Sequence, residues 1–251
     1  MTSPEPIAEE PWVRLAGAPD LETWNRQSEI TWNQTGRQTE KLRFFQAAFD
    51  FLTDNAIAGD YHEYGCHRAR TFRMALTEAR RHSLSGMRFF AFDSFEGLPK
   101  VTSNPAHEVW TSGALRTPEA EFLRLIREHG IYTDHVVTVR GYYTDTLSEE
   151  RQKHFVEDEN PVALACIDCD LYESAVPVFR FLEPLLQEGS VLYVDDLFAG
   201  YRGSPVRGVA RAFSEFRAQS RFRFVRHLDV GWWGRSYIAY LDDPDVPVNL
   251  E

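Results

Sequence analysis

Short apolar runs separated by amphipathic stretches recur along this chain. Two runs near the middle, 162–167 and 191–194, are rich in β-branched and aromatic residues and do not alternate with polar ones. That pattern is typical of parallel strands that are covered on both faces. Between them, apolar residues recur at helical spacing, at Ala175, Val178, Phe179, Leu182, Leu185 and Leu186. Gly189 stands where a glycine would end this helix, so we predict a strand–helix–strand unit over 162–194.

The same alternation extends to both sides of this unit. Apolar stripes predict helices over 40–52, 72–79, 117–130 and 206–216, and apolar runs predict strands over 61–64, 88–92 and 136–139. Two further runs, 222–228 and 237–241, are expected to pair as antiparallel strands. The order predicts an α/β fold, a doubly wound and mostly parallel seven-stranded sheet that ends in an antiparallel hairpin.

One domain accounts for most of the chain. A chain of 251 residues can bury one large α/β core, and no linker requires a second. We expect this domain to span 39–242. Residues 1–38 are weakly periodic and predict an arm that covers the active site, contacts a second subunit or lies along its own core. Residues 243–251 are expected to be a solvated tail.

The charge balance argues against two classes of partner. With 27 Lys and Arg against 38 Asp and Glu, the net charge is −11, a poor match to nucleic acid or to an anionic membrane. No apolar run approaches the roughly 20 residues that cross a bilayer, and residues 1–10 lack the apolar core of a signal peptide. The three cysteines, Cys66, Cys166 and Cys169, suit a reducing compartment. We therefore expect a cytoplasmic protein.

Acidic residues follow both strands of the central unit. Asp168 and Asp170 come after the first strand, and Asp195 and Asp196 come after the second. Neighbouring parallel strands lie roughly 5 Å apart, so these carboxylates are expected to crowd one small volume at the carboxyl edge of the sheet. Carboxylates at such a short distance raise one another's pKa unless a cation lies between them. A hard divalent cation such as Mg²⁺, which prefers oxygen ligands, would resolve the conflict.

The acids and a nearby cysteine pair can also be explained without a ligand. In that case Asp170 and Asp196 would only cap the helices that follow them. One aspartate would fit that interpretation well, but two acidic pairs on adjacent strands favour a metal site. Cys166 and Cys169 have the spacing of a redox or zinc pair, but they lie in a strand and its exit without a second pair, which argues against either use.

A turn with one glycine follows the first predicted strand. Only Gly65 stands in this turn, which argues against the dinucleotide and triphosphate motifs because these need several glycines. The turn would let a ligand approach the backbone, and the helix that follows could receive a carboxylate at its N-terminus. Asp93 ends the next strand, where an acid commonly holds ribose hydroxyls. The connection from Ser94 to about Ser112 is long, which predicts a lid or binding loop.

Five segments within residues 58–217 carry a family resemblance. They are 63–65 (Glu-Tyr-Gly), 92–99 (Phe-Asp-Ser-Phe-Glu-Gly-Leu-Pro), 141–147 (Gly-Tyr-Tyr-Thr-Asp-Thr-Leu), 167–174 (Ile-Asp-Cys-Asp-Leu-Tyr-Glu-Ser) and 194–196 (Val-Asp-Asp). Together they resemble the macrocin O-methyltransferase family, which methylates sugar hydroxyls of macrolide and aminocoumarin natural products. The resemblance implies a class I methyltransferase fold, S-adenosylmethionine and Mg²⁺ as cofactors, a small glycosylated acceptor and a homo-oligomer, in particular a dimer.

The resemblance also implies a role for individual residues. The Mg²⁺ ligands would be Asp168, Asp195 and Asp196, and Asp170 would be the general base. The cofactor-binding residues would be Glu63, Gly65, Arg68, Thr71, Asp93, Ser94, Gly141 and Tyr142. Glu63 and Gly65 would lie along the methionine end of the cofactor, Asp93 at its ribose, and Gly141 with Tyr142 near its adenine.

The chain departs from the family pattern just after Gly65. The family usually has Trp-Arg-Gly-Gly-Ser, whereas residues 67–71 read His-Arg-Ala-Arg-Thr. Ala69 and Arg70 therefore replace both glycines. Because Arg70 is large and charged, it is expected either to obstruct the methionine pocket or to pair with the cofactor carboxylate.

Two alternative functions stay open. The same metal chemistry would serve a catechol or another phenolic diol. No lysine follows the strand ends, where catechol methyltransferases commonly have their base, and this favours a sugar. The second alternative is a binding subunit that has lost catalysis, and Arg70 alone favours it. The four aspartates argue against it, because clustered carboxylates destabilise a protein when no cation offsets their charge. Five aromatic residues are candidates for the acceptor pocket: Trp110, Phe198, Tyr201, Trp232 and Trp233.

Overall fold

The computed structural model describes residues 25–103, 105, 107–243 and 245. Within these residues, seven strands form one sheet: β1 Asp60–Tyr64, β2 Phe89–Asp93, β3 Val136–Arg140, β4 Val162–Ile167, β5 Leu186–Val194, β6 Phe222–Val230 and β7 Gly234–Leu241. Their order across the sheet is β3-β2-β1-β4-β5-β7-β6. Strands β1 to β5 pair in parallel, and β7 is antiparallel to both β5 and β6. The predicted sheet and its closing hairpin are therefore confirmed.

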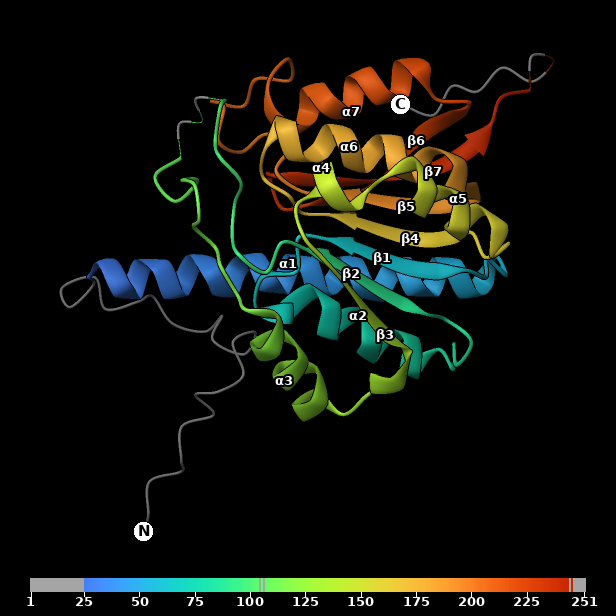
Figure 1. The fold of residues 1–251 in the computed structure, drawn as a ribbon, viewed down its shortest axis with the longest axis horizontal. Coiled ribbons are helices and arrows are strands. Elements are labelled where there is room, and N and C mark those ends of the chain that lie inside the picture. Colours follow the sequence, from blue (N-terminus) through green and yellow to red (C-terminus); the bar gives the residue numbers. More distant parts are fainter. Residues whose placement is uncertain (1–24, 104, 106, 244, 246–251) are drawn as a thin grey trace, which may run out of the picture.

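Helices cover both faces of the sheet (Figure 1). They are α1 Arg26–Asp54, α2 Arg70–Arg81, α3 Glu119–His129, α4 Tyr143–Thr146, α5 Glu149–Glu157, α6 Tyr172–Leu182 and α7 Gly208–Gln219, with short 3₁₀ turns η1 His67–Ala69, η2 Thr133–His135 and η3 Glu183–Leu185. Helices α1, α2 and α3 pack on one face, and α6 and α7 pack on the other with α4 and α5 (Figure 1). None of these described helices is long and apolar enough to cross a bilayer.

The core lies on both sides of the central strands. Every residue of β1 and β4 is buried, as expected for strands that are covered on both faces. On the α1–α2 face, the fully buried rings of Phe45 and Phe72 both pack edge-on against Tyr61 of β1. On the other face, Phe179 of α6 packs against Phe213 of α7. These layers fix the carboxyl ends of β4 and β5 in a rigid frame.

Helix α1 begins much earlier than the periodic stripe over 40–52 predicted. Asn25 caps it by accepting a hydrogen bond from the backbone N–H of Ser28, and the first turns project beyond the sheet (Figure 1). Because these turns are largely exposed, they carry no apolar stripe that periodicity could detect. Residues 26–38 of the predicted arm are therefore helical. Residues 1–24 lie outside the described part, and the role of the arm and the bounds of the domain stay predictions.

The predicted end of the central helix at Gly189 is wrong. Helix α6 ends at Leu182, and Pro184, which has no backbone N–H to continue the ladder, lies in the turn that follows. Leu186 starts β5, and Gly189 lies within that strand with φ 84°. A Cβ on Gly189 would lie 2.3 Å from the Cδ1 atom of Ile57, so this glycine serves close packing in the sheet layer. Apolar spacing alone could not separate the helix from the adjoining strand.

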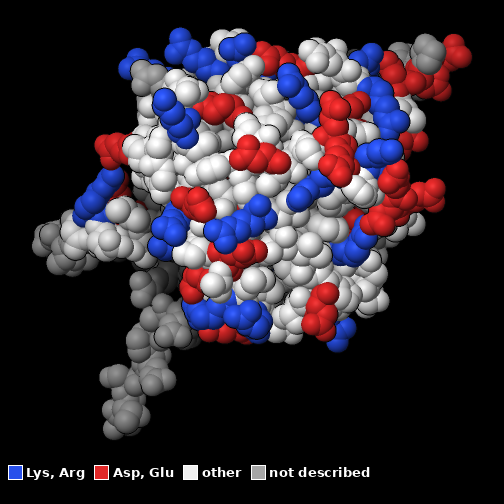
Figure 2. Space-filling model, viewed as in Figure 1, with Lys and Arg blue, Asp and Glu red and all other residues white. Residues whose placement is uncertain are grey.

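Charged side chains of both signs are mixed over the face that Figure 2 shows. Several of them form ion pairs within one helix, such as Arg124 with Glu121 and Glu128 on α3, and Arg211 with Glu215 on α7. Exposed pairs of this kind contribute only about 0.3–0.5 kcal/mol each. The stability of the fold therefore comes mainly from its two core layers.

Candidate active site

Strands β4 and β5 end side by side and bring three aspartates together. Ile167 pairs with Val194 at the ends of the two strands, and the next residue on each is an aspartate, Asp168 or Asp195. The backbone N–H of Asp195 donates to the carbonyl of Ile167 at 2.9 Å, which extends the ladder by one residue. One carboxylate oxygen each of Asp168, Asp195 and Asp196 lie within 4.8 Å of one another. The expected crowding of these side chains is thus present, and their role as metal ligands is a proposal.

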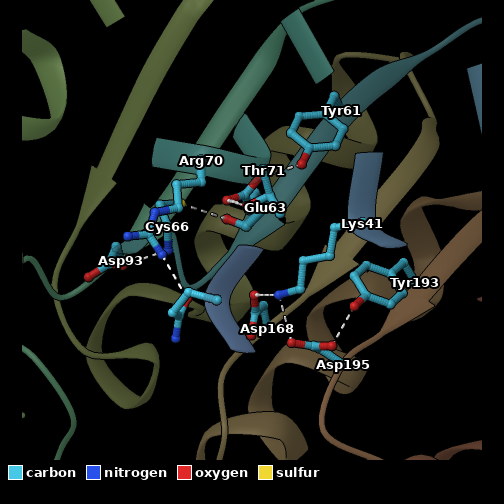
Figure 3. Close-up of polar contacts among 11 residues, drawn as sticks. Lys41, Tyr61, Glu63, Cys66, Arg70, Thr71, Asp93, Asp168, Tyr193 and Asp195 are labelled. Carbon is cyan, nitrogen blue, oxygen red and sulfur yellow. Dashed lines mark hydrogen bonds and ion pairs between the residues drawn. The ribbon is translucent and has the colours of Figure 1, made fainter. Parts of the chain in front are cut away.

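A lysine from α1 reaches into this cluster (Figure 3). The Nζ atom of Lys41 donates to Oδ2 of Asp168 at 2.7 Å and to Oδ2 of Asp195 at 2.8 Å. The Lys41 side chain is only 8% exposed. Burial opposes its charge, but the two carboxylates outweigh burial and raise the pKa of Lys41 well above its usual value. An ammonium therefore stays charged between the two acids.

Lys41 is a residue that the sequence analysis missed. Its signal was present, because Lys41 lies on the same buried face of α1 as Phe44, Phe45 and Ala48. A lysine within an apolar helical stripe needs a buried partner, and two acidic pairs were available. The sugar was preferred to a catechol because no lysine follows the strand ends, and that reason fails because a lysine arrives from a helix instead.

The three aspartates differ in their electrostatics. Burial, followed by the charge of Asp195, raises the pKa of Asp168 well above its usual value, and the same two causes raise that of Asp196. Burial also acts on Asp195, but the charge of Lys41 outweighs it and lowers the pKa of this carboxyl. Asp195 in addition accepts a hydrogen bond from the Tyr193 hydroxyl. The two raised pKa values mean that carboxyl groups this close tend to hold protons unless further positive charge separates them.

Asp170 lies beside this cluster with a raised pKa. Burial and the charge of Asp195 raise its pKa from 3.8 to about 7, although hydrogen bonds from Asp196 and Trp110 partly offset them. Asp170 and Asp196 both hold left-handed backbone conformations, with φ 61° and 56°. Such conformations are uncommon for residues with a side chain and collect at functional sites. A carboxyl group with this pKa is suited to proton transfer near neutral pH.

A cavity of about 660 Å³ opens over these acids. Its size suits a small organic ligand. Asp168, Asp170, Asp195 and Asp196 all line it. Six of the predicted cofactor-binding residues line the same cavity: Gly65, Thr71, Asp93, Ser94, Gly141 and Tyr142. The structure therefore brings the predicted metal ligands, the predicted base and most of the predicted cofactor contacts to one space.

Glu63 and Arg68 do not line this cavity. Glu63 is fully buried on β1, where it accepts hydrogen bonds from the Tyr61 hydroxyl and, at 2.8 Å, from Oγ1 of Thr71 (Figure 3). Burial raises the pKa of Glu63 from 4.5 to about 7 despite these hydrogen bonds. Arg68 uses its backbone N–H to bond Oγ1 of Thr117 at 3.2 Å. Glu63 thus reaches the cavity wall only through Thr71.

The turn after β1 holds the wall of the cavity in place. Gly65 has φ 91°, and a Cβ there would lie 1.9 Å from the carbonyl oxygen of Asp168, so only glycine fits. Asp93 accepts a backbone hydrogen bond from Cys66 at 2.7 Å and another from Phe95 at 2.7 Å. These bonds fix the carboxylate of Asp93 at the end of β2, beside the glycine turn.

Arg70 reaches across the cavity wall toward α1. Its NH1 group donates to Oε1 of Gln34 at 2.9 Å, and both residues line the cavity. Burial, and then the charges of Arg68 and Arg73, lower the pKa of Arg70. No carboxylate among the residues that the structure describes forms an ion pair with it. Ala69, which stands in place of a family glycine, keeps a left-handed backbone with φ 51°.

The candidate acceptor residues fall into two groups. Trp110, Tyr201 and Trp233 pack together in a small apolar cluster, and Trp110 also lines the main cavity. His107 stacks on Trp110 with ring centroids 4.6 Å apart. In contrast, Trp232 is 64% exposed, and neither it nor Phe198 lines the cavity. Of the five aromatic residues predicted, only Trp110 lies directly at the site.

Two polar atoms at the cavity wall are left without partners within the described residues. They are Oε1 of Gln38, on α1, and Nδ1 of His107, in the loop between β2 and α3. Both atoms are inaccessible to solvent in this arrangement. A buried polar atom without a hydrogen bond is costly, and with no exposed surface neither atom can contact a ligand in the cavity in this arrangement.

Comparisons with known proteins identify relatives of this chain and of its fold. Two curated relatives from Streptomyces are "8-demethyl-8-(2,3-dimethoxy-alpha-L-rhamnosyl)-tetracenomycin-C 4'-O-methyltransferase" of Streptomyces olivaceus, 26% identical, and "Demethyldecarbamoylnovobiocin O-methyltransferase" of Streptomyces niveus, 24% identical. Each match covers 62% of this chain and 60% of the relative. The chain therefore aligns with less than two thirds of the length of either relative.

The fold and the family are both established by these comparisons. The solved structure of the O-methyltransferase NovP superposes with a TM-score of 0.63 and 22% identity, and the match covers 79% of each chain. The sheet order and the C-terminal antiparallel pair are those of a class I methyltransferase. Residues 21–233 match the family described as macrocin-O-methyltransferase (TylF). The chain belongs to the macrocin O-methyltransferase family.

Proposed function

We propose that this protein transfers a methyl group from S-adenosylmethionine to a sugar hydroxyl of a glycosylated natural product, with Mg²⁺ activating the acceptor. One observation carries the proposal: the aspartate cluster, Asp170 and the glycine turn of β1 all line a single cavity. A metal site, a base and a cofactor cradle within one space are what metal-assisted methyl transfer requires. The family of the chain supports the reaction class.

The donor set fits a hard divalent cation. Asp168, Asp195 and Asp196 offer only oxygen atoms, which Mg²⁺ prefers, and three carboxylates leave positions for water and substrate. The ammonium of Lys41 already lies between two of these carboxylates, so this position favours positive charge. A bound Mg²⁺ would act as a Lewis acid that lowers the pKa of an acceptor hydroxyl.

Asp170 is the group that we propose removes the acceptor proton. A sugar hydroxyl is a poor nucleophile because its pKa lies far above neutrality. Its oxygen would form a bond to the methyl carbon as the carbon–sulfur bond breaks, and Asp170 would take the hydroxyl proton. General-base assistance of this kind is typically worth about 10²–10⁴-fold in rate. Asp170 lines the same cavity as the three proposed metal ligands, which places it near an acceptor hydroxyl at the metal.

The cofactor would lie along the carboxyl ends of β1 and β2. We propose that Gly65 allows its close approach, that Asp93 holds its ribose, and that Gly141 with Tyr142 contacts its adenine. Ser94 lines the same part of the cavity. Glu63 would act through Thr71 rather than by direct contact, because it lies beneath the wall.

Polar residues at the cavity wall favour a sugar acceptor. A catechol presents two hydroxyls, and both would be used at the metal. A sugar has further hydroxyls that can bond polar wall residues such as Gln34, Thr102 and Glu173. Trp110 supplies an apolar surface in the same cavity. One curated relative is itself named as a methyltransferase of a rhamnosyl compound, which agrees with a sugar.

A phenolic diol is the second candidate acceptor. The observation that favours it is Lys41, because a lysine beside the metal is where a catechol methyltransferase would have its base. A third possibility is a binding subunit that has lost catalysis, and the feature that favours it is Arg70 at the cavity wall. The dimer and the cytoplasmic location expected from the sequence stay predictions.

Calorimetry followed by an acceptor panel tests the proposal. S-adenosylhomocysteine is titrated into the full chain, first with Mg²⁺ and then with a chelator. We expect saturable micromolar binding, and folded protein that binds nothing in either buffer would support a degenerate family member. Labelled S-adenosylmethionine is then offered with rhamnosides and with catechols. Transfer to a rhamnoside supports the proposal, whereas transfer to catechols alone supports the second candidate.

A further inference from the structure

We propose that Lys41 is a tethered cation that competes with the divalent metal for Asp168 and Asp195. In the metal-free protein its ammonium holds the two carboxylates together, and a bound metal displaces it into the cavity. Lys41 would thereby set the metal affinity of the enzyme. This inference rests on the metal site of the proposed function and adds a role for a residue of α1.

The ammonium and a bound metal would compete for the same carboxylate oxygens. Nζ of Lys41 lies 2.7 Å from Oδ2 of Asp168 and 2.8 Å from Oδ2 of Asp195. Magnesium–oxygen distances are about 2.1 Å, so a metal on either of these oxygens would lie within about 5 Å of Nζ. Both cations would be buried, where like charges repel far more strongly than they do in water. Metal binding to these oxygens would therefore disfavour the ammonium in its present position.

Both oxygens of Asp195 are occupied by protein donors, so a metal at this residue would replace one of them. One of its oxygens accepts from Lys41, and the other accepts from the Tyr193 hydroxyl (Figure 3). Both oxygens of this candidate ligand are thus engaged by protein groups. Tyr193 is itself fixed, because its ring packs 4.7 Å from that of Phe44 and is fully buried. Of the two donors, Lys41 is the one on a flexible stem, so it is the one that can exchange with a metal.

The cavity gives the displaced ammonium a place to go. Lys41 lines it together with Gln34, Arg37 and Gln38, which lie on the same face of α1. A small rotation of the Lys41 stem would move Nζ from the acids into this polar space without moving the helix. The ammonium would then face the acceptor side of the cavity.

Removal of the Lys41 charge should raise metal affinity and lower the stability of the metal-free protein. Lys41→Met keeps the length of the stem and removes the ammonium, so a metal no longer has to displace it. Metal affinity is expected to rise by about tenfold or more, which corresponds to about 1.4 kcal/mol. Without metal, however, the carboxylates lose their neutralising partner, so the thermal midpoint in chelator is expected to fall. Added metal should restore it.

The test uses Mn²⁺ as the probe and the full chain as the protein. Mn²⁺ affinity is measured by calorimetry and by electron paramagnetic resonance for wild type, Lys41→Met and Lys100→Met. Lys100 lines the same cavity but is exposed, so its variant is a control with the same loss of charge. The thermal midpoint of each is measured in chelator and in Mn²⁺. Only Lys41→Met should bind Mn²⁺ more tightly and show a metal-dependent rescue of stability.

The possible outcomes separate this inference from the proposed function. If wild type binds Mn²⁺ and a folded Lys41→Met variant binds it with equal or lower affinity, the proposed competition is wrong. The metal site of the proposed function is then still supported. No Mn²⁺ binding by wild type or either variant overturns both. If Lys41→Met does not fold, Lys41→Gln replaces it, since glutamine keeps a hydrogen-bond donor without the charge. That variant too must bind Mn²⁺ more tightly than wild type.

Discussion

The ammonium of Lys41, on the first helix, lies 2.8 Å from the carboxylate of Asp195 at the end of β5. This ion pair joins residues that are 154 positions apart in the chain. It makes α1 a part of the candidate active site, to which the helix also contributes Gln34 and Gln38. The long helix therefore positions functional groups as well as covering one face of the sheet.

Removal of either strand-end aspartate is expected to abolish metal binding. Asp168→Ala and Asp195→Ala each delete one oxygen donor and leave the remaining cluster short of ligands. We expect Mn²⁺ affinity to fall by at least about 100-fold and Mg²⁺-dependent turnover to disappear. Calorimetry and a labelled-methyl assay measure the two effects, and the exposed Asp243→Ala is the control. Metal binding at wild-type affinity in either variant would show that the cation lies elsewhere.

Replacement of the proposed base should separate binding from chemistry. Asp170→Asn keeps the shape of the side chain, and asparagine tolerates the left-handed backbone at φ 61°. It cannot accept the acceptor proton, so kcat is expected to fall by about 10²–10⁴-fold. Affinity for Mn²⁺ and for S-adenosylhomocysteine should stay close to wild type. Normal turnover in this variant would refute the assignment of Asp170.

Arg70 is expected to help hold the cofactor rather than to exclude it. Among the described residues, its guanidinium bonds only the neutral Gln34 side chain. Burial, and then the charges of Arg68 and Arg73, lower its pKa, so its surroundings favour an anion. The carboxylate of S-adenosylhomocysteine can supply one. Arg70→Met should therefore weaken its binding by about tenfold, whereas the exposed Arg80→Met on the same helix should not. Tighter binding in Arg70→Met would instead mean that the arginine obstructs the pocket.

Glu63 should make stability depend on pH. Its pKa is raised from 4.5 to about 7 in the folded protein, so the folded state holds this proton more tightly than the unfolded chain does. The contribution of the neutral Glu63 side chain to stability is therefore fully present below pH 4.5 and is lost as the pH rises through about 7. The side chain of Glu63→Gln stays neutral at every pH. As the pH rises, the unfolding free energy of the variant should therefore increase relative to that of wild type by up to about 3 kcal/mol.

Denaturant unfolding at pH 5 and pH 8, without cofactor, measures this shift. The exposed Glu150→Gln serves as the control and should follow wild type at both pH values. A difference between wild type and Glu63→Gln that does not change with pH would mean that Glu63 is already ionised in the folded protein.

The sheet and the acid cluster could both be predicted because each depends on local pattern. Short apolar runs mark buried strands wherever they occur, and an aspartate directly after such a run must lie at the edge of the sheet. Parallel pairing of β4 with β5 then fixes the distance between Asp168 and Asp195. No information from distant parts of the chain is needed for either step.

The missed features depend on contacts between distant segments. The Lys41 contact to Asp168 spans 127 positions: the buried helical stripe indicates that Lys41 needs a partner, but it does not indicate which one. Glu63 was expected at the methionine end of the cofactor, but it lies beneath Thr71, because the register of β1 directs it into the core. The boundary at Gly189 failed because Leu185 and Leu186 continue the helical spacing of apolar residues, although α6 ends at Leu182 and Leu186 already begins β5.

The central claim is metal-dependent methylation of a sugar hydroxyl, and one assay tests it most directly. Labelled S-adenosylmethionine is incubated with the full chain and a mixture of rhamnosides and catechols, in Mg²⁺ and in chelator, and the methylated product is identified by mass spectrometry. We predict a methoxy group on the sugar in Mg²⁺ and none in chelator. A product that forms equally in chelator, or one that carries the methyl group only on a catechol, would contradict the account.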